Sequence, residues 1–334
     1  MSHLYIVENG SRLGIDGGYF VIEQKDGLIR KIPKETLESI VIFGNCSVTT
    51  PCINSLLANN IPVSYFSSKG KYFGRFVSTS NQNIVRIKKQ FFLCENKGFR
   101  TEISKKFLAG KISNQKVVLK RYSDNNNIDI TQNMIQIKSA EKKIILCDSG
   151  ETLMGYEGTA AKYYFDGLSK LVKKEFAFDG RKKRPPRDPF NSMLSLGYTL
   201  LMYEIYAEIE SRSLNPYAGF LHRDQYSHPA LASDLMEEWR PVIVDSMVLS
   251  MIQRKEIHIE DFESDEETGA VWLNNTSLKR FIKKFEEKLN VKVDYIKDIE
   301  SQCSFRKAIW HQIGRLVSAI ESEDGKKYMP IQIR

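Results

Sequence analysis

The sequence predicts a multidomain α+β protein in which a small N-terminal β-rich domain precedes a larger all-α C-terminal domain. Up to residue 77 the chain consists of short apolar segments separated by glycine-containing turns, which is typical of strands. Beyond residue 84 apolar residues recur three and four positions apart, which is typical of helices. A chain of 334 residues is also long enough for two domains.

The N-terminal domain, residues 1–77, is predicted to contain one short helix among strands rich in Ile, Val, Phe and Tyr. The helix covers residues 51–60, with Pro51 near its first turn. Asn9-Gly10, Gly17-Gly18 and Asp26-Gly27 suit tight turns that need a positive φ. The predicted strands cover residues 3–8, 18–24, 28–32, 38–43, 62–66 and 71–77.

A polar run over residues 78–83 predicts the linker, and residues 84–334 form the predicted helical domain. The first two predicted helices are separated by residues 109–110, where Gly110 lies. The predicted helices cover residues 84–108, 111–123, 131–146, 150–174, 189–212, 230–253, 277–289 and 303–322.

Composition narrows the class of protein. No apolar run approaches the about 18 residues that a membrane-spanning helix needs, so no membrane partner is expected. The first residues lack the basic and apolar regions of a signal peptide, and we expect a cytoplasmic protein. Five scattered cysteines without a CxxC spacing argue against a disulfide framework or a structural zinc site.

Positive charge is concentrated in one stretch. The formal net charge is +8, and residues 84–121 contain eleven Lys and Arg against Glu95 and Glu102. Residues 257–269 are acidic in turn, with six Asp and Glu. A dense cationic surface attracts a nucleic-acid backbone through counterion release. Taken alone, the stretch fits a solvated helix face equally well.

Three clusters in the helical region carry candidate chemistry. Glu157 lies between Gly155 and Gly158, which suggests close approach of a ligand or of another helix. His222 follows an apolar pair, and a lone His in this setting is more often structural. Asp234 shares a helix face with Glu237 and with Glu238, which indicates either a metal site or a solvated acidic edge.

Together these clusters point to a divalent metal. One imidazole nitrogen and carboxylate oxygens, with positions left for water and phosphate, suit Mg²⁺ or Mn²⁺. Such an ion beside a cationic surface is what phosphodiester cleavage or transfer requires. A basic segment with two prolines adds a candidate phosphate contact, because proline keeps it extended and off the core. Its cations are Arg181, Lys182, Lys183, Arg184 and Arg187.

Five stretches in order resemble the CRISPR-associated Cas-one family. They are Gly-Tyr-Glu-Gly (155–158), Arg-Pro-Pro-Arg-Asp-Pro-Phe-Asn (184–191), Leu-Ser-Leu-Gly-Tyr (194–198), Gly-Phe-Leu-His (219–222) and Asp-Leu-Met-Glu-Glu-Trp-Arg-Pro (234–241). Residues 111–115 and 305–312 provide further matches, and the resemblance extends over nearly the whole chain.

The resemblance implies an integrase and endonuclease of CRISPR adaptation. Family members dimerise, and two dimers flank a dimer of the Cas-two protein to give a heterohexamer. The complex inserts a captured double-stranded DNA fragment into the CRISPR repeat when a 3′-hydroxyl attacks a repeat-boundary phosphodiester. The N-terminal β domain is the expected dimerisation domain.

The resemblance also assigns the site. It implies Glu157, His222 and Glu237 as catalytic metal ligands for Mg²⁺ or Mn²⁺, with Asp234 as a supporting acid or further ligand. Arg223 and the basic segment are the implied DNA contacts. Two alternatives remain open at this point: a stand-alone metal-dependent DNA-repair nuclease, and a non-catalytic DNA-bridging scaffold.

Overall fold

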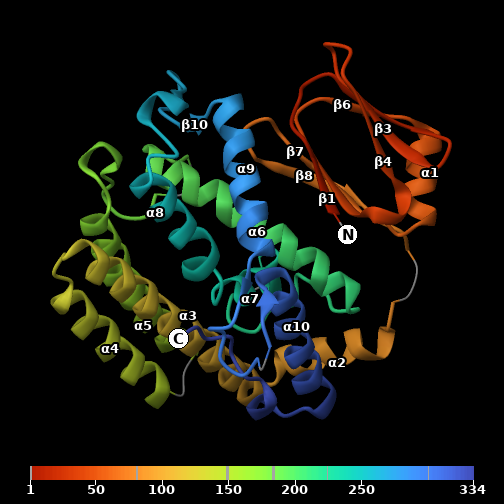
Figure 1. The fold of residues 1–334 in the computed structure, drawn as a ribbon. Helices are drawn as coiled ribbons and strands as arrows, with labels where there is room; N and C mark the ends of the chain where they lie inside the picture. The colour runs from red at the N-terminus through yellow and green to blue at the C-terminus, as the bar shows by residue number, and fades with distance from the viewer. Residues whose placement is uncertain (1, 80–81, 148–149, 183–184, 224, 300) are drawn as a thin grey trace. The chain divides into compact units, whose positions relative to one another are not determined.

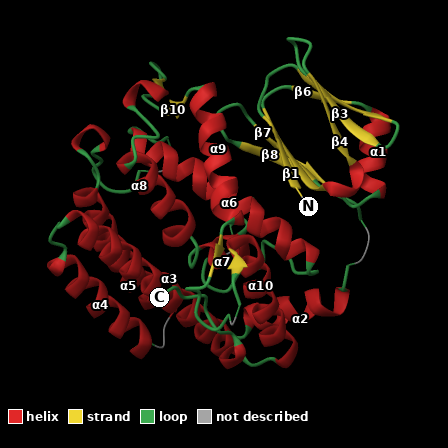
Figure 2. Ribbon diagram, viewed as in Figure 1, coloured by secondary structure: helices red, strands yellow, loops and turns green. Residues whose placement is uncertain are grey.

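Strands dominate the first part of the chain and helices the rest, which confirms the predicted fold class (Figures 1 and 2). The structure is a computed structural model that describes residues 2–79, 82–147, 150–182, 185–223, 225–299 and 301–334. The chain divides into two compact units, residues 1–82 with 273–282 and residues 83–272 with 283–334. This division differs from the predicted one, which places residues 273–282 in the helical domain.

The first unit contains two four-stranded sheets and one short helix, α1 (Thr50–Ala58). In the first sheet β1, β5 and β7 are parallel and β8 is antiparallel to β7. In the second sheet β4, β3 and β2 are antiparallel and β6 pairs in parallel with β2. In sheet order the strands are β1 (Ser2–Ile6), β5 (Leu37–Phe43), β7 (Val63–Phe66) and β8 (Tyr72–Phe76), then β4 (Ile29–Pro33), β3 (Tyr19–Glu23), β2 (Ser11–Asp16) and β6 (Cys46–Val48).

Strand β2 was not predicted, because its sequence mixes glycine and polar residues and buries few side chains. Leu13 is the residue of β2 that reaches the core fully, at 0% exposure. The predicted turn that follows β2 is confirmed: Asp16 pairs with Tyr19, and Gly17 and Gly18 take φ values of 52° and 93°. Glycine adopts this left-handed region without the steric cost that a Cβ brings.

Apolar side chains from both sheets and from α1 share one core. Phe20, Ile40, Leu56 and Val63 are each fully buried in it. Alternation along the strands delivers these residues to the inner faces, since successive side chains of a strand point to opposite sides. The unit therefore has its own hydrophobic core.

The second unit is built mainly from helices. They are α2 (Ile84–Glu95), α3 (Lys97–Asn126), α4 (Thr131–Leu146), α5 (Gly150–Leu171), α6 (Pro189–Ser211), α7 (Ala230–Met236), α8 (Ser246–Gln253), α9 (Asn275–Asn290, divided between the units) and α10 (Phe305–Ser322). Two short pairs, β9 (Phe262–Ser264) with β10 (Val271–Leu273) and β11 (Lys292–Val293) with β12 (Cys303–Ser304), complete the elements. No helix in the described ranges is long and apolar enough to cross a membrane.

The first helical break lies at Asn96 and not at residues 109–110, which corrects the prediction. The Asn96 side chain accepts a hydrogen bond from the Phe99 N–H and caps the 30-residue helix α3. Gly110 lies inside α3, where an added Cβ would come within 2.9 Å of Glu238 Cγ and of Pro330 Cβ. The glycine thus marks close packing against two later segments and not a helix end.

Helix α7 leads into a π-helix, Arg240–Asp245, before α8 begins. Trp239, just before it, is fully buried and donates its indole N–H to Gln312 at 2.7 Å. The predicted single helix over 230–253 is therefore three consecutive segments. Single π-turns inside helices are frequent at functional sites, and the residues on either side of this one form the site described next.

Candidate metal and DNA site

Asp234 organises the segment that carries His222. Its Oδ2 accepts hydrogen bonds from the backbone N–H of Phe220 at 2.7 Å and of Leu221 at 2.9 Å. Its Oδ1 accepts one from the backbone N–H of His222 at 2.9 Å and lies 2.6 Å from His222 Nδ1. Asp234 is 0% exposed. Both oxygens are therefore engaged, and the side chain orients His222 in preference to binding an ion itself.

Gly219 allows this turn to form. A Cβ at this position would lie 2.7 Å from Ala230 Cβ and 2.9 Å from Asp234 Oδ2. A larger residue would push the segment away from α7 and break the bonds to Asp234. The bond at Nδ1 also selects the tautomer with the proton on Nδ1, which leaves the lone pair of His222 on Nε2.

One ammonium group lies between Glu157 and Glu237. Lys111, on α3, extends its Nζ to Glu237 Oε2 at 2.6 Å and donates a hydrogen bond to Glu157 Oε1. Burial alone would lower the pKa of Lys111, but the charges of Glu237 and Glu157 outweigh it and the pKa is raised. Lys111 therefore stays a cation that joins α3, α5 and the end of α7.

Arg240 provides the second cation at Glu237. Its Nη1 lies 2.9 Å from Glu237 Oε1. Burial would raise the pKa of Glu237, but Arg240 and Lys111 lower it to about 2. Burial likewise opposes protonation of His222, yet the hydrogen bond to Asp234 and the charge of Glu237 raise its pKa. The charges of His222 and Glu237 are thus coupled.

A buried network supports Arg240 from behind. The guanidinium of Arg240 lies 4.9 Å from the centre of the Tyr198 ring, and that of Arg181 lies 5.3 Å from it. The Tyr198 hydroxyl donates to Asp245 at 2.5 Å and the Tyr164 hydroxyl does so at 2.7 Å. Burial raises the pKa of Asp245 to about 6. Cation–π contacts of this kind stabilise buried guanidinium groups.

Glu238 differs from its neighbour in every contact. Its Oε1 accepts from the Tyr328 hydroxyl at 2.7 Å and its Oε2 from the Ile331 N–H at 2.6 Å. Burial raises its pKa to about 8. Glu237 faces two cations and stays ionised, whereas Glu238 holds the C-terminal segment. The structure thus separates two adjacent glutamates that sequence alone left as a choice.

The donor set suits a divalent cation, although its members do not surround one point in this conformation. Within the described residues no group of three His, Cys, Asp or Glu side chains lies close enough to hold an ion. Glu237 Oε2 is buried, and within the same residues it accepts no hydrogen bond of good geometry. Two carboxylates that already share a cation, beside an oriented imidazole, are the ligand types that Mg²⁺ or Mn²⁺ takes.

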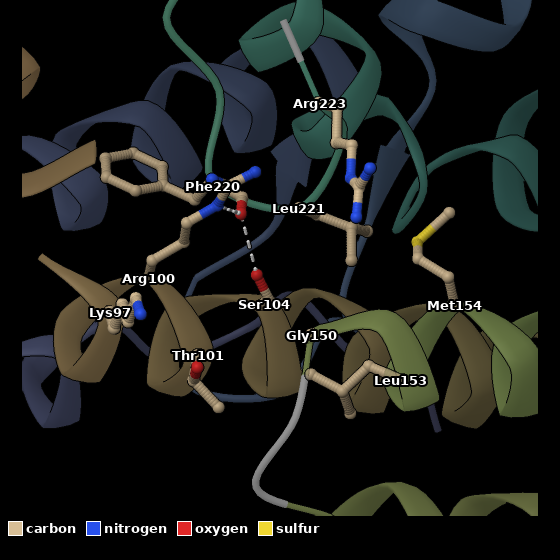
Figure 3. A pocket seen from close by; sticks show the side chains of 10 residues that line it. All are labelled: Lys97, Arg100, Thr101, Ser104, Gly150, Leu153, Met154, Phe220, Leu221 and Arg223. Carbon is tan, nitrogen blue, oxygen red and sulfur yellow. Dashed lines mark hydrogen bonds between the residues drawn. The ribbon is translucent and has the colours of Figure 1, made fainter. Parts of the chain in front are cut away.

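A cavity of about 720 Å³ adjoins His222 (Figure 3). It lies between α3, the start of α5 and the segment 220–223, as Figure 3 shows. Arg100 and Ser104 both donate to the Phe220 carbonyl, at 2.7 Å and 3.0 Å, which fixes one wall. The cations at the cavity are Lys97, Arg100 and Arg223, and Leu153, Met154 and Leu221 contribute apolar surface.

The predicted basic segment is only partly available to a ligand. Arg181 packs on Tyr198 and donates to Asn191 Oδ1 at 2.8 Å and to Ser195 Oγ at 3.0 Å, contrary to the expectation that this segment stays off the core. Lys182 and Arg187 are exposed. Lys183 and Arg184 lie outside the described residues. DNA contact by this segment stays a prediction.

A family model described as "CRISPR associated protein Cas1" matches residues 4–287. This chain belongs to the Cas1 family. A "CRISPR-associated endonuclease Cas1" from Mycobacterium tuberculosis is 34% identical over 333 residues, covering 100% of this chain and 98% of the relative. "CRISPR-associated endonuclease Cas1 3" from Thermus thermophilus is 32% identical and covers 99% and 97%.

Solved structures share the Cas1 fold over nearly the full length. A casposase bound to integration product has a TM-score of 0.85 at 28% identity and covers 98% of this chain and 94% of its own. A Cas1 protein from Thermotoga maritima has a TM-score of 0.81 at 22% identity and covers 96% and 97%. The architecture of both units is therefore that of the family.

Sequence reasoning missed the two cations of this Cas1 site. Lys111 falls in a stretch that was noted only as a family match, and 46 positions separate it from Glu157. Arg240 follows Glu237 by three positions, and that spacing places two side chains on one helix face. The spacing was a usable signal for Arg240. For Lys111 the signal was weaker, because a lysine in a basic helix is usually solvated.

Proposed function

We propose that this chain is the metal-dependent integrase and endonuclease of CRISPR adaptation, which inserts foreign DNA fragments into a CRISPR array. The observation that carries the proposal is the buried pairing of Glu157 and Glu237 around one cation, beside an oriented His222, in a Cas1-family chain. Relatives named as endonucleases, and a structural neighbour bound to its integration product, support it.

Glu157, His222 and Glu237 would hold a Mg²⁺ or Mn²⁺ ion through carboxylate oxygens and Nε2. When bound, the ion supplies charge neutralisation and polarises the phosphate. Asp234 holds the proton on Nδ1 of His222, and Arg240 keeps Glu237 ionised. In the reaction a 3′-oxygen forms a new bond to phosphorus while the repeat's own P–O bond breaks. One phosphodiester replaces another, so no external energy source is needed.

The cavity beside His222 is the DNA contact that we propose with it. Lys97, Arg100 and Arg223 line its wall within one or two residues of the site segment or on α3. Phosphates attract such groups, and contacts of this kind fix the register of a nucleic acid without reading its sequence. Exposed Lys182 and Arg187 extend the same proposal.

The proposed assembly follows the family. Two copies of this chain would form a homodimer through the β-rich unit, and two dimers would flank a Cas2 dimer as a heterohexamer. The proposed substrates are double-stranded DNA, both the incoming fragment and the CRISPR repeat. Family membership supports this part of the proposal.

A strand-transfer assay tests the function. Chain, Cas2, a short DNA fragment and an array-bearing plasmid are incubated with Mn²⁺, and joined product is expected at a repeat boundary. EDTA is expected to abolish joining while leaving most DNA affinity, since phosphate contacts supply most of that affinity. Hydrolysis without joining, even with Cas2, would point to a repair nuclease. DNA binding with no chemistry would point to a scaffold.

Lys97→Ala is expected to weaken DNA binding uniformly across sequences and to reduce the slope of log affinity against log salt by about 1. Lys97 suits the test better than Arg100, which also holds the Phe220 carbonyl, so that its loss would disturb the site segment. Fluorescence anisotropy at several salt concentrations measures the slope. Lys307→Ala, an exposed lysine on α10 away from the cavity, is the matched control. Equal slopes for both variants would remove Lys97 from the DNA surface.

A further inference from the structure

Lys111 is a charged residue in the interior of the protein. Its side chain is 7% exposed, and its Nζ reaches carboxylates on two other segments, Glu157 on α5 and Glu237 at the end of α7. Lysine is rarely buried unless it is paired. Lys111 is therefore part of the site and not a solvated residue of α3.

The charges at this cluster already balance. Lys111 and Arg240 contribute two positive charges, and Glu157 and Glu237 contribute two negative charges. A divalent ion added to the same carboxylates would leave two uncompensated positive charges in a buried place. Uncompensated buried charge is strongly unfavourable. The ion and the Lys111 ammonium thus need the same two carboxylates.

We propose that Lys111 is an internal cation that competes with the divalent ion for Glu157 and Glu237. Metal binding then requires its ammonium to leave the two carboxylates. This inference rests on the proposed metal site. A DNA phosphate beside the site offers the displaced ammonium a new partner. Metal and DNA therefore strengthen each other's binding, and by linkage the coupling is reciprocal.

Mn²⁺ titration tests the competition. Free Mn²⁺ is followed by electron paramagnetic resonance for the wild-type chain, Lys111→Met, Lys111→Arg and Glu157→Gln, with and without a short DNA duplex. Lys111→Met is expected to bind Mn²⁺ at least about tenfold more tightly than wild type without DNA, and to gain little from DNA. Lys111→Arg keeps a competing charge and is expected to bind no more tightly than wild type. Equal or weaker binding by Lys111→Met overturns the proposal.

Thermal unfolding provides a second measurement, because two carboxylates without a cation could destabilise Lys111→Met. That variant is expected to unfold at a lower temperature than wild type in EDTA and to gain more stability from Mn²⁺. Failure to fold even in saturating Mn²⁺ would overturn the proposal, since the ion should then replace the ammonium. Glu157→Gln locates the ion: Mn²⁺ affinity equal to wild type would refute the metal site itself. Strand transfer by wild type without tighter binding by Lys111→Met would refute the competition alone.

Discussion

Glu157→Gln is expected to reduce strand transfer and cleavage about a thousandfold, which corresponds to about 4 kcal/mol of transition-state stabilisation. The substitution removes a negative charge from the pair that would hold the metal and keeps nearly the same side-chain volume. DNA affinity is expected to change less than about threefold, because phosphate contacts lie elsewhere. Single-turnover joining rates and anisotropy titrations measure the two effects separately.

Glu141→Gln is the matched control for this variant. Glu141 pairs with Lys116 at 2.5 Å on another part of the second unit, and both side chains are 22% exposed, against 19% for Glu157. The control thus loses a carboxylate–lysine pair of similar burial away from the site. If both variants lose joining to the same degree, the loss reflects stability and the assigned role of Glu157 is wrong.

Asp234→Ala is expected to lower the free energy of unfolding by about 3–5 kcal/mol and to abolish joining. The buried carboxylate accepts three backbone N–H groups and contacts the His222 ring. Hydrogen bonds to a charged group contribute about 1.5–3 kcal/mol each, and donors left buried without acceptors cost more still. Urea denaturation measures the free energy, and joining is assayed at a temperature where the variant is folded.

His222→Ala separates the two roles of this residue pair. It removes the ring from Asp234 but keeps the three backbone bonds, so joining should be lost while stability falls by less than about 1.5 kcal/mol. A stability for Asp234→Ala within about 1 kcal/mol of wild type would contradict the view that Asp234 builds the segment.

Local patterns predicted the fold better than the site. The turn at Gly17-Gly18 follows from φ alone, and it was predicted correctly. The role of Gly110 depends on Glu238 and Pro330, which meet it from segments more than a hundred residues away. Such contacts leave no periodic trace in the sequence, so the predicted helix break at this glycine was wrong.

The same limit applied to the acids. Glu237 and Glu238 are adjacent, and their spacing from Asp234 places either one on the right face of a helix. Their environments separate them, because Lys111 and Arg240 reach one and Tyr328 reaches the other. Family resemblance suggested Glu237, and the metal role itself stays a proposal.

The π-helix Arg240–Asp245 has a consequence for how this segment tolerates insertions and deletions. A π-turn accommodates more residues per turn than an α-helix. Removing one residue between Arg240 and Asp245 would let the segment relax to an α-helix and would rotate everything beyond it by about 100°. Asp245 would then lose Tyr164 and Tyr198, while Glu237, upstream, would keep its place. Length, as well as residue type, is therefore constrained here: substitutions should be tolerated at more positions of this segment than single-residue deletions.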